Sequence, residues 1–342
     1  MNHPCAAELL TWYDRSARRL SWRGQTDPYR IVVSEVMLQQ TTVAAVGPRY
    51  ARFLARFPDV GTLAAADWPE LAEEWAGLGY YARARNLHAA ARAIAAMGGF
   101  PTDSVGWRRL PGIGPYTAAA IGAIALNEPV VPLDGNVERV VARLFAIETP
   151  LPSAKAELGR LADGFAAQPE MRARPGDFAQ ALFDLGATIC TPRNPACAIC
   201  PWREGCGAAA LGIASSLPRK SPKPARSVIH GAHFALSAAA GRLLLIRRPE
   251  AGLLGGMLAL PGTPWRAEPW TDSEALTHAP LPGIAWQARP GTAQHAFTHR
   301  ELTMRVFAAR VAAFPDGSES ATLDQAAGSL PTAMRKLLPL IN

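Results

Sequence analysis

Four of the five cysteines crowd into one short stretch, with the spacing Cys190-x6-Cys197-x2-Cys200-x5-Cys206. Thiolates are soft ligands, and four of them in so short a segment can surround one inorganic centre. A structural zinc site usually has two short C-x2-C pairs, whereas only one pair is short here. The wider loop therefore favours a [4Fe–4S] cluster in a reducing compartment, with zinc or four buried structural thiols as the alternatives.

Two carboxylates have the surroundings of an acid–base pair. Glu35 lies in the apolar stretch 32–38, where desolvation favours the protonated acid that a general acid needs near neutral pH. Asp134 directly precedes a predicted helix over 136–147, so it is expected either to cap that helix or to stay ionised facing a developing cation. One neutral and one charged carboxyl is the arrangement that glycosidases use.

The stretch 110–118 links two predicted helical runs and carries Gly112 and Gly114. Without Cβ atoms these glycines let backbone N–H groups approach an anion, and Pro115 opens the next helix. The positive end of that helix adds to the attraction for a phosphate. A helix-hairpin-helix over about 104–127, which holds a DNA phosphate without reading sequence, is therefore predicted; an ordinary glycine-rich turn is the alternative.

These motifs resemble those of the adenine DNA glycosylases of the MutY family, within the endonuclease III superfamily. The resemblance rests on residues 34–41, 77–86 and 133–137 and on the cysteine loop, and it runs from about residue 8 to 210 with a weaker continuation. It implies a monofunctional base-excision-repair enzyme that flips out adenine mispaired with 8-oxoguanine or guanine in duplex DNA. It also implies one [4Fe–4S] cluster, which orders a basic loop near the DNA.

The resemblance assigns roles to individual residues. Glu35 would protonate the adenine ring at N7, and Asp134 would stabilise the sugar oxocarbenium or trap it briefly. Tyr116 and Asn136 would position these groups. The DNA and substrate contacts implied are the wedge residues Gln40 and Tyr80, the phosphate-binding Gly112 and Gly114, the adenine-pocket residues Trp22, Arg23, Leu38 and Gln180, and the lesion-sensing Phe297, Thr298 and His299. Trp22 and Leu38 are equally compatible with a place in the core.

Tyr116 bears on the type of glycosylase. Bifunctional relatives carry a lysine there as the Schiff-base nucleophile, and this chain has tyrosine. We therefore expect little lyase activity. Two other classes stay open: an endonuclease III-like glycosylase/lyase for pyrimidine lesions, and a non-catalytic iron–sulfur protein that only binds DNA.

The elements that must position these residues fall into two groups. Residues 1–212 read as a mainly α helix-hairpin-helix glycosylase domain, in which Asp27 caps a helix running from Pro28 to Thr42. Residues 213–227 are a basic, proline-rich linker, and residues 228–342 read as a smaller α+β Nudix-like domain. The remaining predicted helices are 48–57, 69–76, 83–97, 116–127, 155–167, 176–189, 272–278 and 331–340.

The predicted strands of the second domain are 228–237 and 242–248, joined as a hairpin, and two or three more within 292–311. Working Nudix enzymes hold Mg²⁺ on a glutamate-rich helix after a turn such as the one at 260–264. This chain has only Asp272 and Glu274 there, so diphosphohydrolase activity is not expected. The segment 294–300 resembles the lesion-sensing loop of the family, with Thr298 where serine is usual.

The composition sets broad limits. The 342 residues are 49% apolar and carry a net charge of +7, which excludes global disorder and suits a polyanionic partner, although solubility alone would also explain the charge. The N-terminus has no secretory pattern and no stretch is long enough to span a membrane. A monomer in the cytoplasm of a bacterial type of cell, associated with the nucleoid, is therefore expected.

Overall fold

The computed structural model describes residues 3–222, 225–249, 252–297 and 299–341. The chain divides into two compact units, Met1–Ser221 and Pro222–Asn342. This division falls inside the segment 213–227 that was predicted as a linker. In the described part of the chain no helix is long and apolar enough to cross a membrane.

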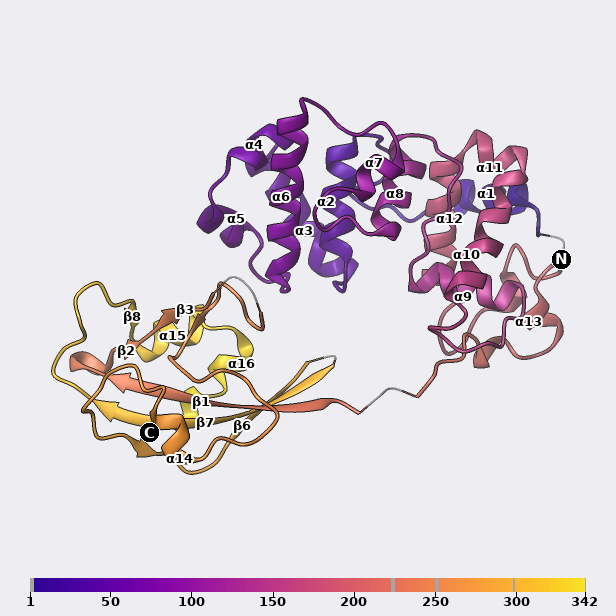
Figure 1. Ribbon diagram of the computed structural model, residues 1–342. Coiled ribbons are helices and arrows are strands. Elements are labelled where there is room, and N and C mark those ends of the chain that lie inside the picture. Colours follow the sequence, from indigo (N-terminus) through magenta and orange to yellow (C-terminus); the bar gives the residue numbers. More distant parts are fainter. Residues whose placement is uncertain (1–2, 223–224, 250–251, 298, 342) are drawn as a thin grey trace. The chain divides into compact units, whose positions relative to one another are not determined.

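The first unit is helical, as its amphipathic periodicity predicts (Figure 1). Short 3₁₀ turns at Gly164–Ala167, Cys197–Ile199 and Ala214–Ser216 supplement its α-helices. Those helices are α1 (Ala6–Ser16), α2 (Pro28–Leu38), α3 (Val43–Arg56), α4 (Val60–Ala65), α5 (Trp68–Glu74), α6 (Tyr81–Met97), α7 (Ser104–Arg108), α8 (Pro115–Ala125), α9 (Gly135–Leu144), α10 (Lys155–Asp163), α11 (Pro169–Ala173), α12 (Pro175–Thr188) and α13 (Gly207–Ala210).

Helix α2 begins as predicted and ends early. The Asp27 carboxylate accepts a hydrogen bond from the Tyr29 N–H at 2.9 Å, and Pro28 occupies the first turn. The expected continuation to Thr42 is wrong. Gln40 turns into the left-handed region with φ 55°, and Thr42 instead caps the next helix, α3. Glu35 therefore lies one turn from the carboxyl end of α2.

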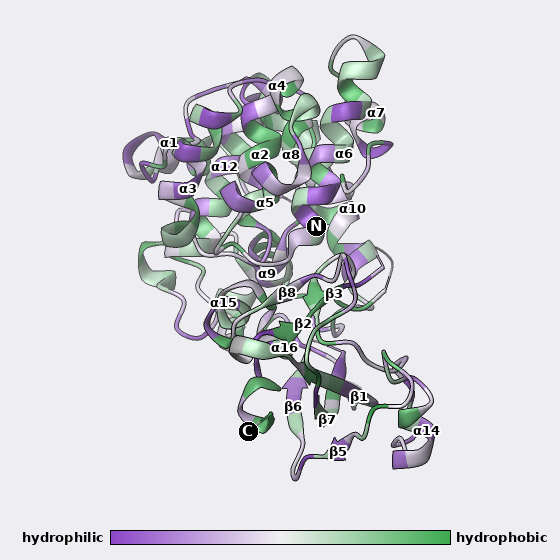
Figure 2. Cartoon of the chain, turned by 90° about the vertical axis from the view of Figure 1, so that its left-hand side faces the viewer, coloured by the Kyte–Doolittle hydropathy of each residue, from purple (hydrophilic) through white to green (hydrophobic). Residues whose placement is uncertain are grey.

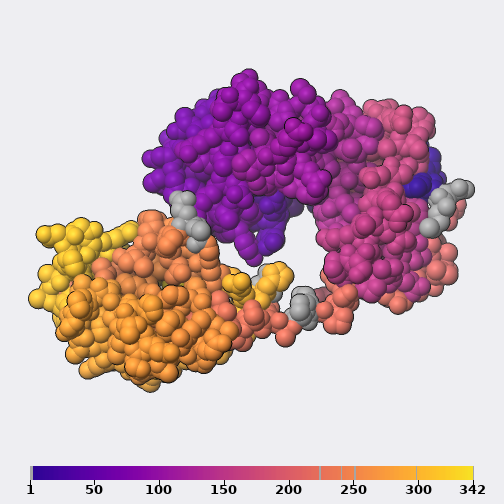
Figure 3. Space-filling model, in the orientation of Figure 1, coloured from indigo at the N-terminus to yellow at the C-terminus, as the bar shows by residue number. Residues whose placement is uncertain are grey.

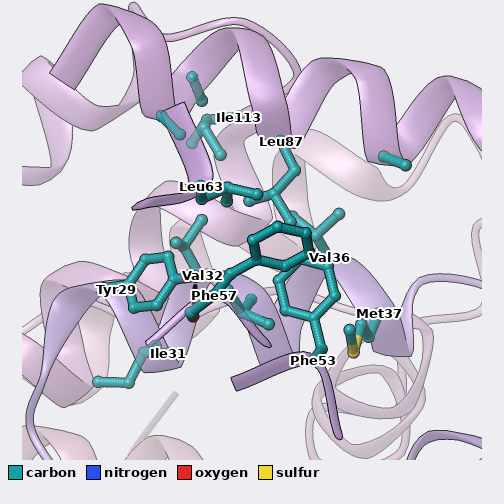
Figure 4. Packing of buried hydrophobic residues seen from close by; sticks show 14 of the residues in the cluster. Tyr29, Ile31, Val32, Val36, Met37, Phe53, Phe57, Leu63, Leu87 and Ile113 are labelled. Carbon is teal, nitrogen blue, oxygen red and sulfur yellow. Dashed lines mark hydrogen bonds between the residues drawn. The ribbon is translucent and has the colours of Figure 1, made fainter. Parts of the chain in front are cut away.

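Two hydrophobic cores lie within the helical unit. The first packs α2 against α3, α4, α6 and the hairpin before α8, and Figure 4 shows the rings of Phe53 and Phe57 beside Val32 and Val36 of α2. The second is built on α1, α9, α10 and α12. Figure 2 shows the hydrophobic colour on α2 and α8, whereas α3 and α5 carry hydrophilic stretches. In the space-filling view the helical unit is one continuous body (Figure 3).

The second core also anchors the cysteine loop. Trp202, between Cys200 and Cys206, is 1% exposed and stacks on Phe165 with ring centroids 5.3 Å apart. Its indole N–H donates to the Cys5 carbonyl at 2.9 Å. The loop is therefore tied to the start of α1 as well as to the core.

The second unit contains a mixed sheet, and residues of short helices pack into both of its hydrophobic clusters. The strand order is β5-β7-β1-β2-β8, and β6 is also paired to β7. The long central strands run parallel, from the pair Ser227–Arg300 to the pair Ser237–Arg310. A separate two-stranded sheet joins β3 to β4. The strands are β1 (Ser227–Ser237), β2 (Leu243–Leu244), β3 (Ile246–Arg247), β4 (Leu258–Ala259), β5 (Gln287–Ala288), β6 (Ala293–Ala296), β7 (Arg300–Arg310) and β8 (Ser320–Ala321).

The expected hairpin over 228–248 is confirmed at its turn, but its second strand is much shorter than predicted. Only Ser237 and Leu243 pair across it, because a 3₁₀ turn at Ala239–Gly241 is followed by a short β2, and the chain then leaves for the second sheet. The two strands expected within 292–311 are present as β6 and β7. The helical segments are α14 (Asp272–Leu276), α15 (Leu323–Ser329), α16 (Thr332–Arg335) and the 3₁₀ turn Leu338–Leu340; of these, α15 was not predicted.

Candidate active site

Glu35 is a buried carboxyl that is hydrogen-bonded by the Tyr116 phenol. Its side chain projects from α2, is 6% exposed, and accepts a hydrogen bond from the Tyr116 hydroxyl to Oε2 at 2.7 Å. Burial raises the pKa of Glu35 to about 7, against the lowering effects of the Tyr116 hydrogen bond and the Arg23 charge. Burial also raises the pKa of Tyr116 well above 10, so the phenol keeps its proton and donates it. The carboxyl is therefore poised as a general acid near neutral pH.

Asp134 caps helix α9, as its position predicts. Its Oδ1 accepts the N–H groups of Asn136 at 2.9 Å and Val137 at 2.7 Å, and Oδ2 accepts the Asn136 side-chain amide at 3.0 Å. Burial raises the pKa of Asp134 above its ordinary value, and these three hydrogen bonds oppose the rise. The helix N-terminus was expected to keep Asp134 ionised, and burial acts against that effect and outweighs it in the net pKa shift. Donors to the carboxylate still favour the charged form.

The structure brings the predicted catalytic residues together from three helices. Glu35 comes from α2, Tyr116 from the first turn of α8, and Asp134 with Asn136 from the start of α9. The charge of Asp134 adds to the raised pKa of both Glu35 and Tyr116, so the two carboxyls lie within electrostatic reach of each other. An acid and an anionic group are thus close enough to interact, as a glycosidic cleavage requires.

The residues expected in the adenine pocket have mixed surroundings. Trp22 is 7% exposed and belongs to the first core, where its ring lies 5.8 Å from that of Tyr50, and Leu38 is half-buried against the same core. Gln180 is buried on α12 and donates to the Gly176 carbonyl at 3.1 Å. A core role for Trp22 and Leu38 therefore has direct support in the packing.

Arg23 depends on a carboxylate that the sequence analysis missed. Its Nη2 lies 2.9 Å from Asp184 Oδ1, and its Nη1 donates to the Tyr13 hydroxyl at 2.8 Å. Asp184 is fully buried on α12 and also accepts the Arg18 side chain at 2.7 Å. An aspartate inside an apolar helical run was the available signal, the same kind that singled out Glu35.

The two predicted wedge residues share an unusual backbone. Gln40 and Tyr80 have φ values of 55° and 48°, in the left-handed region that non-glycine residues rarely adopt. Both side chains are exposed, and Tyr80 is 59% exposed. Strained, exposed residues of this kind persist where the surrounding structure holds them in place.

The predicted helix-hairpin-helix consists of α7, a turn and α8. Gly112 has φ 72°, and a Cβ there would collide with Asn86, so glycine is required by the fold. Gly114 has an ordinary φ of −83°, and a Cβ there would meet nothing within 4 Å. The fold itself places no demand on Gly114, which directly precedes the exposed Pro115 at the start of α8.

The four clustered cysteines line one small cavity with Arg143 and Arg203. Burial, with smaller contributions from the charges of the other three thiols, raises the pKa of Cys200 to about 11, so four thiolates require a compensating cationic centre. Arg143, 1% exposed, donates to Cys190 Sγ at 3.3 Å and to the carbonyl of Thr191 at 2.7 Å. A soft, fourfold thiolate set around one cavity fits an iron–sulfur cluster.

The same loop is connected to the Asp134 helix. Arg139 of α9 donates to the Cys190 carbonyl at 2.7 Å and to Asn136 Oδ1 at 2.9 Å. Asn136 in turn binds Asp134. Sequence reasoning did not identify Arg139, because a basic residue in a helix carries no local signal of such a link.

In the second unit, the expected lesion-sensing residues lie between β6 and β7. Phe297 is half-buried against the core and its ring lies 4.7 Å from that of His295, while His299 is exposed. Thr298 lies outside the described residues. The two acidic residues of α14 are engaged: Asp272 binds Arg305 at 2.8 Å, and Glu274 binds Arg266 at 2.6 Å and completes the capping box with Thr271.

Three family descriptions match separate parts of the chain. Residues 33–162 match the HhH-GPD superfamily of base excision DNA repair proteins. Residues 190–206 match the iron–sulfur binding domain of endonuclease III, so the cysteine loop is an iron–sulfur site, as predicted. Residues 232–340 match the NUDIX domain, which confirms the predicted architecture of the second unit.

Curated relatives carry one common name. An adenine DNA glycosylase of Mycolicibacterium smegmatis is 41% identical over 205 residues, covering 58% of this chain and 69% of that protein. The adenine DNA glycosylases of Arabidopsis thaliana and Homo sapiens are 37% and 34% identical, covering 74% and 78% of this chain. The chain spans 46% and 59% of the length of those two proteins, respectively.

Solved structures confirm the fold of the helical unit. A thermostable thymine-DNA glycosylase is 27% identical with a TM-score of 0.53, covering 60% of this chain and 95% of that one. An endonuclease III in a non-covalent complex with DNA is 20% identical with a TM-score of 0.51, covering 61% of this chain and 94% of that one. The mainly helical glycosylase fold is thus shared, whereas the reaction depends on the site.

Proposed function

Because the chain belongs to the adenine DNA glycosylase family, we propose that it hydrolyses the N-glycosidic bond of adenine paired with 8-oxoguanine or guanine in duplex DNA. The observation that carries this proposal is the buried Glu35 carboxyl, whose pKa is about 7 and whose Oε2 is held by Tyr116 within electrostatic reach of Asp134. A neutral acid beside an anionic group matches departure of a protonated base from a cationic sugar.

The chemistry follows from what these residues can do. Glu35 donates its proton to adenine N7, which makes the base a neutral leaving group. The Asp134 carboxylate, oriented by Asn136 and by the start of α9, faces the oxocarbenium charge that develops on the sugar. Water then attacks C1′ and loses a proton, which returns the Glu35 carboxylate to its acid form. Since Glu35 is only 6% exposed, adenine must leave the base stack to reach it.

The surface around this site supports duplex DNA as the partner. The hairpin at Gly112 and Gly114 presents backbone N–H groups and the start of α8 to a phosphate. Gln40 and Tyr80 stand exposed for insertion beside the lesion, and the whole chain carries a net charge of +7. We propose that the protein acts as a monomer on nucleoid DNA in the cytoplasm.

The other parts have supporting roles in this proposal. Cys190, Cys197, Cys200 and Cys206 would hold one [4Fe–4S] cluster, which when bound cross-links the loop that Arg139 connects to the Asp134 helix. Phe297, Thr298 and His299 would recognise 8-oxoguanine. The engaged carboxylates of α14, Asp272 and Glu274, argue against Mg²⁺-dependent diphosphohydrolysis by the second unit.

A panel of duplexes tests the proposed substrate. The protein would be incubated in excess with adenine opposite 8-oxoguanine, adenine opposite guanine, and an oxidised pyrimidine opposite guanine, and the released bases quantified. We expect adenine release only, with abasic sites that break on alkali treatment. Release of the pyrimidine in place of adenine would favour the endonuclease III-like alternative.

Borohydride trapping tests the monofunctional assignment. Tyr116 supplies no amine that could form a Schiff base. Little covalent enzyme–DNA adduct is therefore expected with the duplex that carries adenine opposite 8-oxoguanine. Trapping in proportion to base release would contradict that assignment.

A further inference from the structure

Arg83 joins the two segments that carry the exposed residues Gln40 and Tyr80. It lies in the first turn of α6, and its guanidinium reaches back to the carboxyl end of α2. Nη1 donates to the carbonyls of Val36 at 2.8 Å and Met37 at 3.0 Å. These are carbonyls of the last turn of α2, which lack partners within the helix.

The guanidinium also binds the chain next to both strained positions. On one side, Nη1 donates to the Gln39 carbonyl and Nη2 to Thr41 Oγ1 at 3.1 Å, the residues directly before and after Gln40. On the other side, Nη2 donates to the carbonyls of Leu78 at 2.9 Å and Gly79 at 3.2 Å, directly before Tyr80.

Arg83 contacts the Tyr80 ring as well. Its Cζ lies 5.6 Å from the Tyr80 ring centroid and 5.5 Å from that of Trp75. A planar guanidinium can hold several carbonyls and an aromatic ring at the same time, whereas a lysine ammonium is a single point charge. The left-handed backbone of Gln40 and Tyr80 is therefore anchored to one side chain.

We propose that Arg83 is a positioning residue that sets the spacing and backbone conformation of Gln40 and Tyr80, so that the two side chains enter the duplex together. The inference rests on the proposed function, which places both residues in DNA. Arg83 acts through them and takes no part in the proton transfer. Its loss is expected to impair insertion and base flipping more than the chemical step.

The first test compares Arg83→Lys with Arg92→Lys. Arg92 is exposed on the same helix and bonds only weakly to the Ala64 carbonyl, at 3.3 Å, so it is a matched control. The duplex would carry 2′-fluoroadenosine, which resists cleavage, opposite 8-oxoguanine, with the fluorescent base 2-aminopurine beside it. Arg83→Lys should lose about tenfold or more in the equilibrium constant for flipping, and Arg92→Lys should match wild type.

A double-mutant cycle separates positioning from general structural support. If Arg83 acts through the wedge, Arg83→Lys should cost little further flipping once Tyr80 and Gln40 are replaced by alanine. Additive losses, or equal flipping by wild type and Arg83→Lys, would overturn the inference. If wild type flips adenine normally and only this cycle fails, the proposed function stands; if wild type neither flips nor releases adenine, the proposed function fails.

Hydrogen exchange gives a second readout that does not involve DNA. In Arg83→Lys, amides of 39–41 and of 78–80 should exchange faster together, while those of α8 and α9 stay protected. Faster exchange throughout the helical unit, or no change in either segment, would also overturn the inference. If Arg83→Lys does not fold, Arg83→Gln replaces it in the flipping and hydrogen-exchange experiments, because its side-chain amide can still donate hydrogen bonds.

Discussion

The chemical site (Glu35, Tyr116, Asp134 and Asn136), whose side chains are buried or half-buried, and the rim (the exposed Gln40 and Tyr80 with the half-buried Gly114) are organised in opposite ways. Each polar group of the chemical site has a protein partner, such as the 2.7 Å hydrogen bond from Tyr116 to Glu35. The rim residues present side chains or backbone outward. Gln40 follows Glu35 by only five positions along the chain. The difference indicates that the chain itself preorganises the chemical site, and it is consistent with the proposal that DNA completes the rim.

Apart from loss of the acid itself, the largest expected effect distinguishes the chemical site, which sets the reaction rate, from the rim, which sets the affinity for DNA. Asp134→Asn keeps a good helix cap but removes the anion, so the single-turnover rate at saturating enzyme should fall by about 10²–10³-fold. Gln40→Ala should weaken binding of the adenine–8-oxoguanine duplex and leave the saturated rate within about threefold of wild type. An equal reduction of the saturated rate in both variants would contradict the assignment of Asp134 to the chemistry and Gln40 to DNA binding.

Because Glu35 is buried, the free energy of unfolding should decrease as the pH rises and the carboxyl ionises. Its pKa rises on folding from 4.5 to about 7, so its stabilising contribution is fully present below pH 4.5 and is lost as the pH rises through 7. The shift of the Glu35 pKa from 4.5 to about 7 corresponds to a decrease of about 3 kcal/mol in the free energy of unfolding.

The Glu35→Gln side chain still accepts the Tyr116 hydrogen bond but cannot ionise. The free energy of unfolding of Glu35→Gln minus that of wild type should therefore be larger at about pH 8 than at about pH 4.5. Urea unfolding of both proteins at the two pH values measures this. The exposed Glu73→Gln on α5 serves as the control and should show no such trend. An identical pH dependence for wild type and Glu35→Gln would mean that Glu35 is not desolvated.

Within the hairpin, the two glycines should respond differently. Gly112→Ala places a Cβ against Asn86 at a φ of 72° and should lower the free energy of unfolding by about 1–3 kcal/mol. Gly114→Ala meets open space, so stability should change by less than about 0.5 kcal/mol, while DNA affinity falls several-fold because the Cβ hinders the phosphate. Unchanged DNA binding by a folded Gly114→Ala variant would show that Gly114 does not contact the DNA phosphate.

The smallest expected effect concerns the Tyr116 hydrogen bond. This bond lowers the pKa of Glu35, so Tyr116→Phe should raise it and move the alkaline limb of the pH–rate profile upward from about 7. The maximal rate should fall about tenfold because the carboxyl loses its orientation. An alkaline limb that stays in place would show that Tyr116 does not tune the acid.

Much of the site was predictable because its signals are local. Asp27 and Pro28 mark the start of α2, the apolar neighbours of Glu35 imply burial, and Asp134 stands where a helix cap belongs. The cysteine spacing is likewise complete within 17 residues, from Cys190 to Cys206. Each signal depends on neighbours along the chain, and the structure and comparisons agree with the fold and cofactor drawn from them.

The parts that the sequence did not reveal depend on distant contacts. The early end of α2 follows from Gln40, whose neighbours are bound by Arg83, and Asp184 meets Arg23 from 161 residues away. In the second unit β1 pairs along its whole length with β7, a parallel partner far along the chain, while β2 occupies the other edge of β1. Local periodicity contains no information about such pairings.

The central claim is that Glu35 acts as the acid for adenine departure. Its most direct test is single-turnover adenine release from a duplex with adenine opposite 8-oxoguanine, for wild type and Glu35→Gln, each with its cluster and confirmed DNA binding. We expect rapid release by wild type and a loss of about 10²–10⁴-fold in the variant. Release at the wild-type rate by Glu35→Gln, or none by a wild type that binds the duplex, would contradict it.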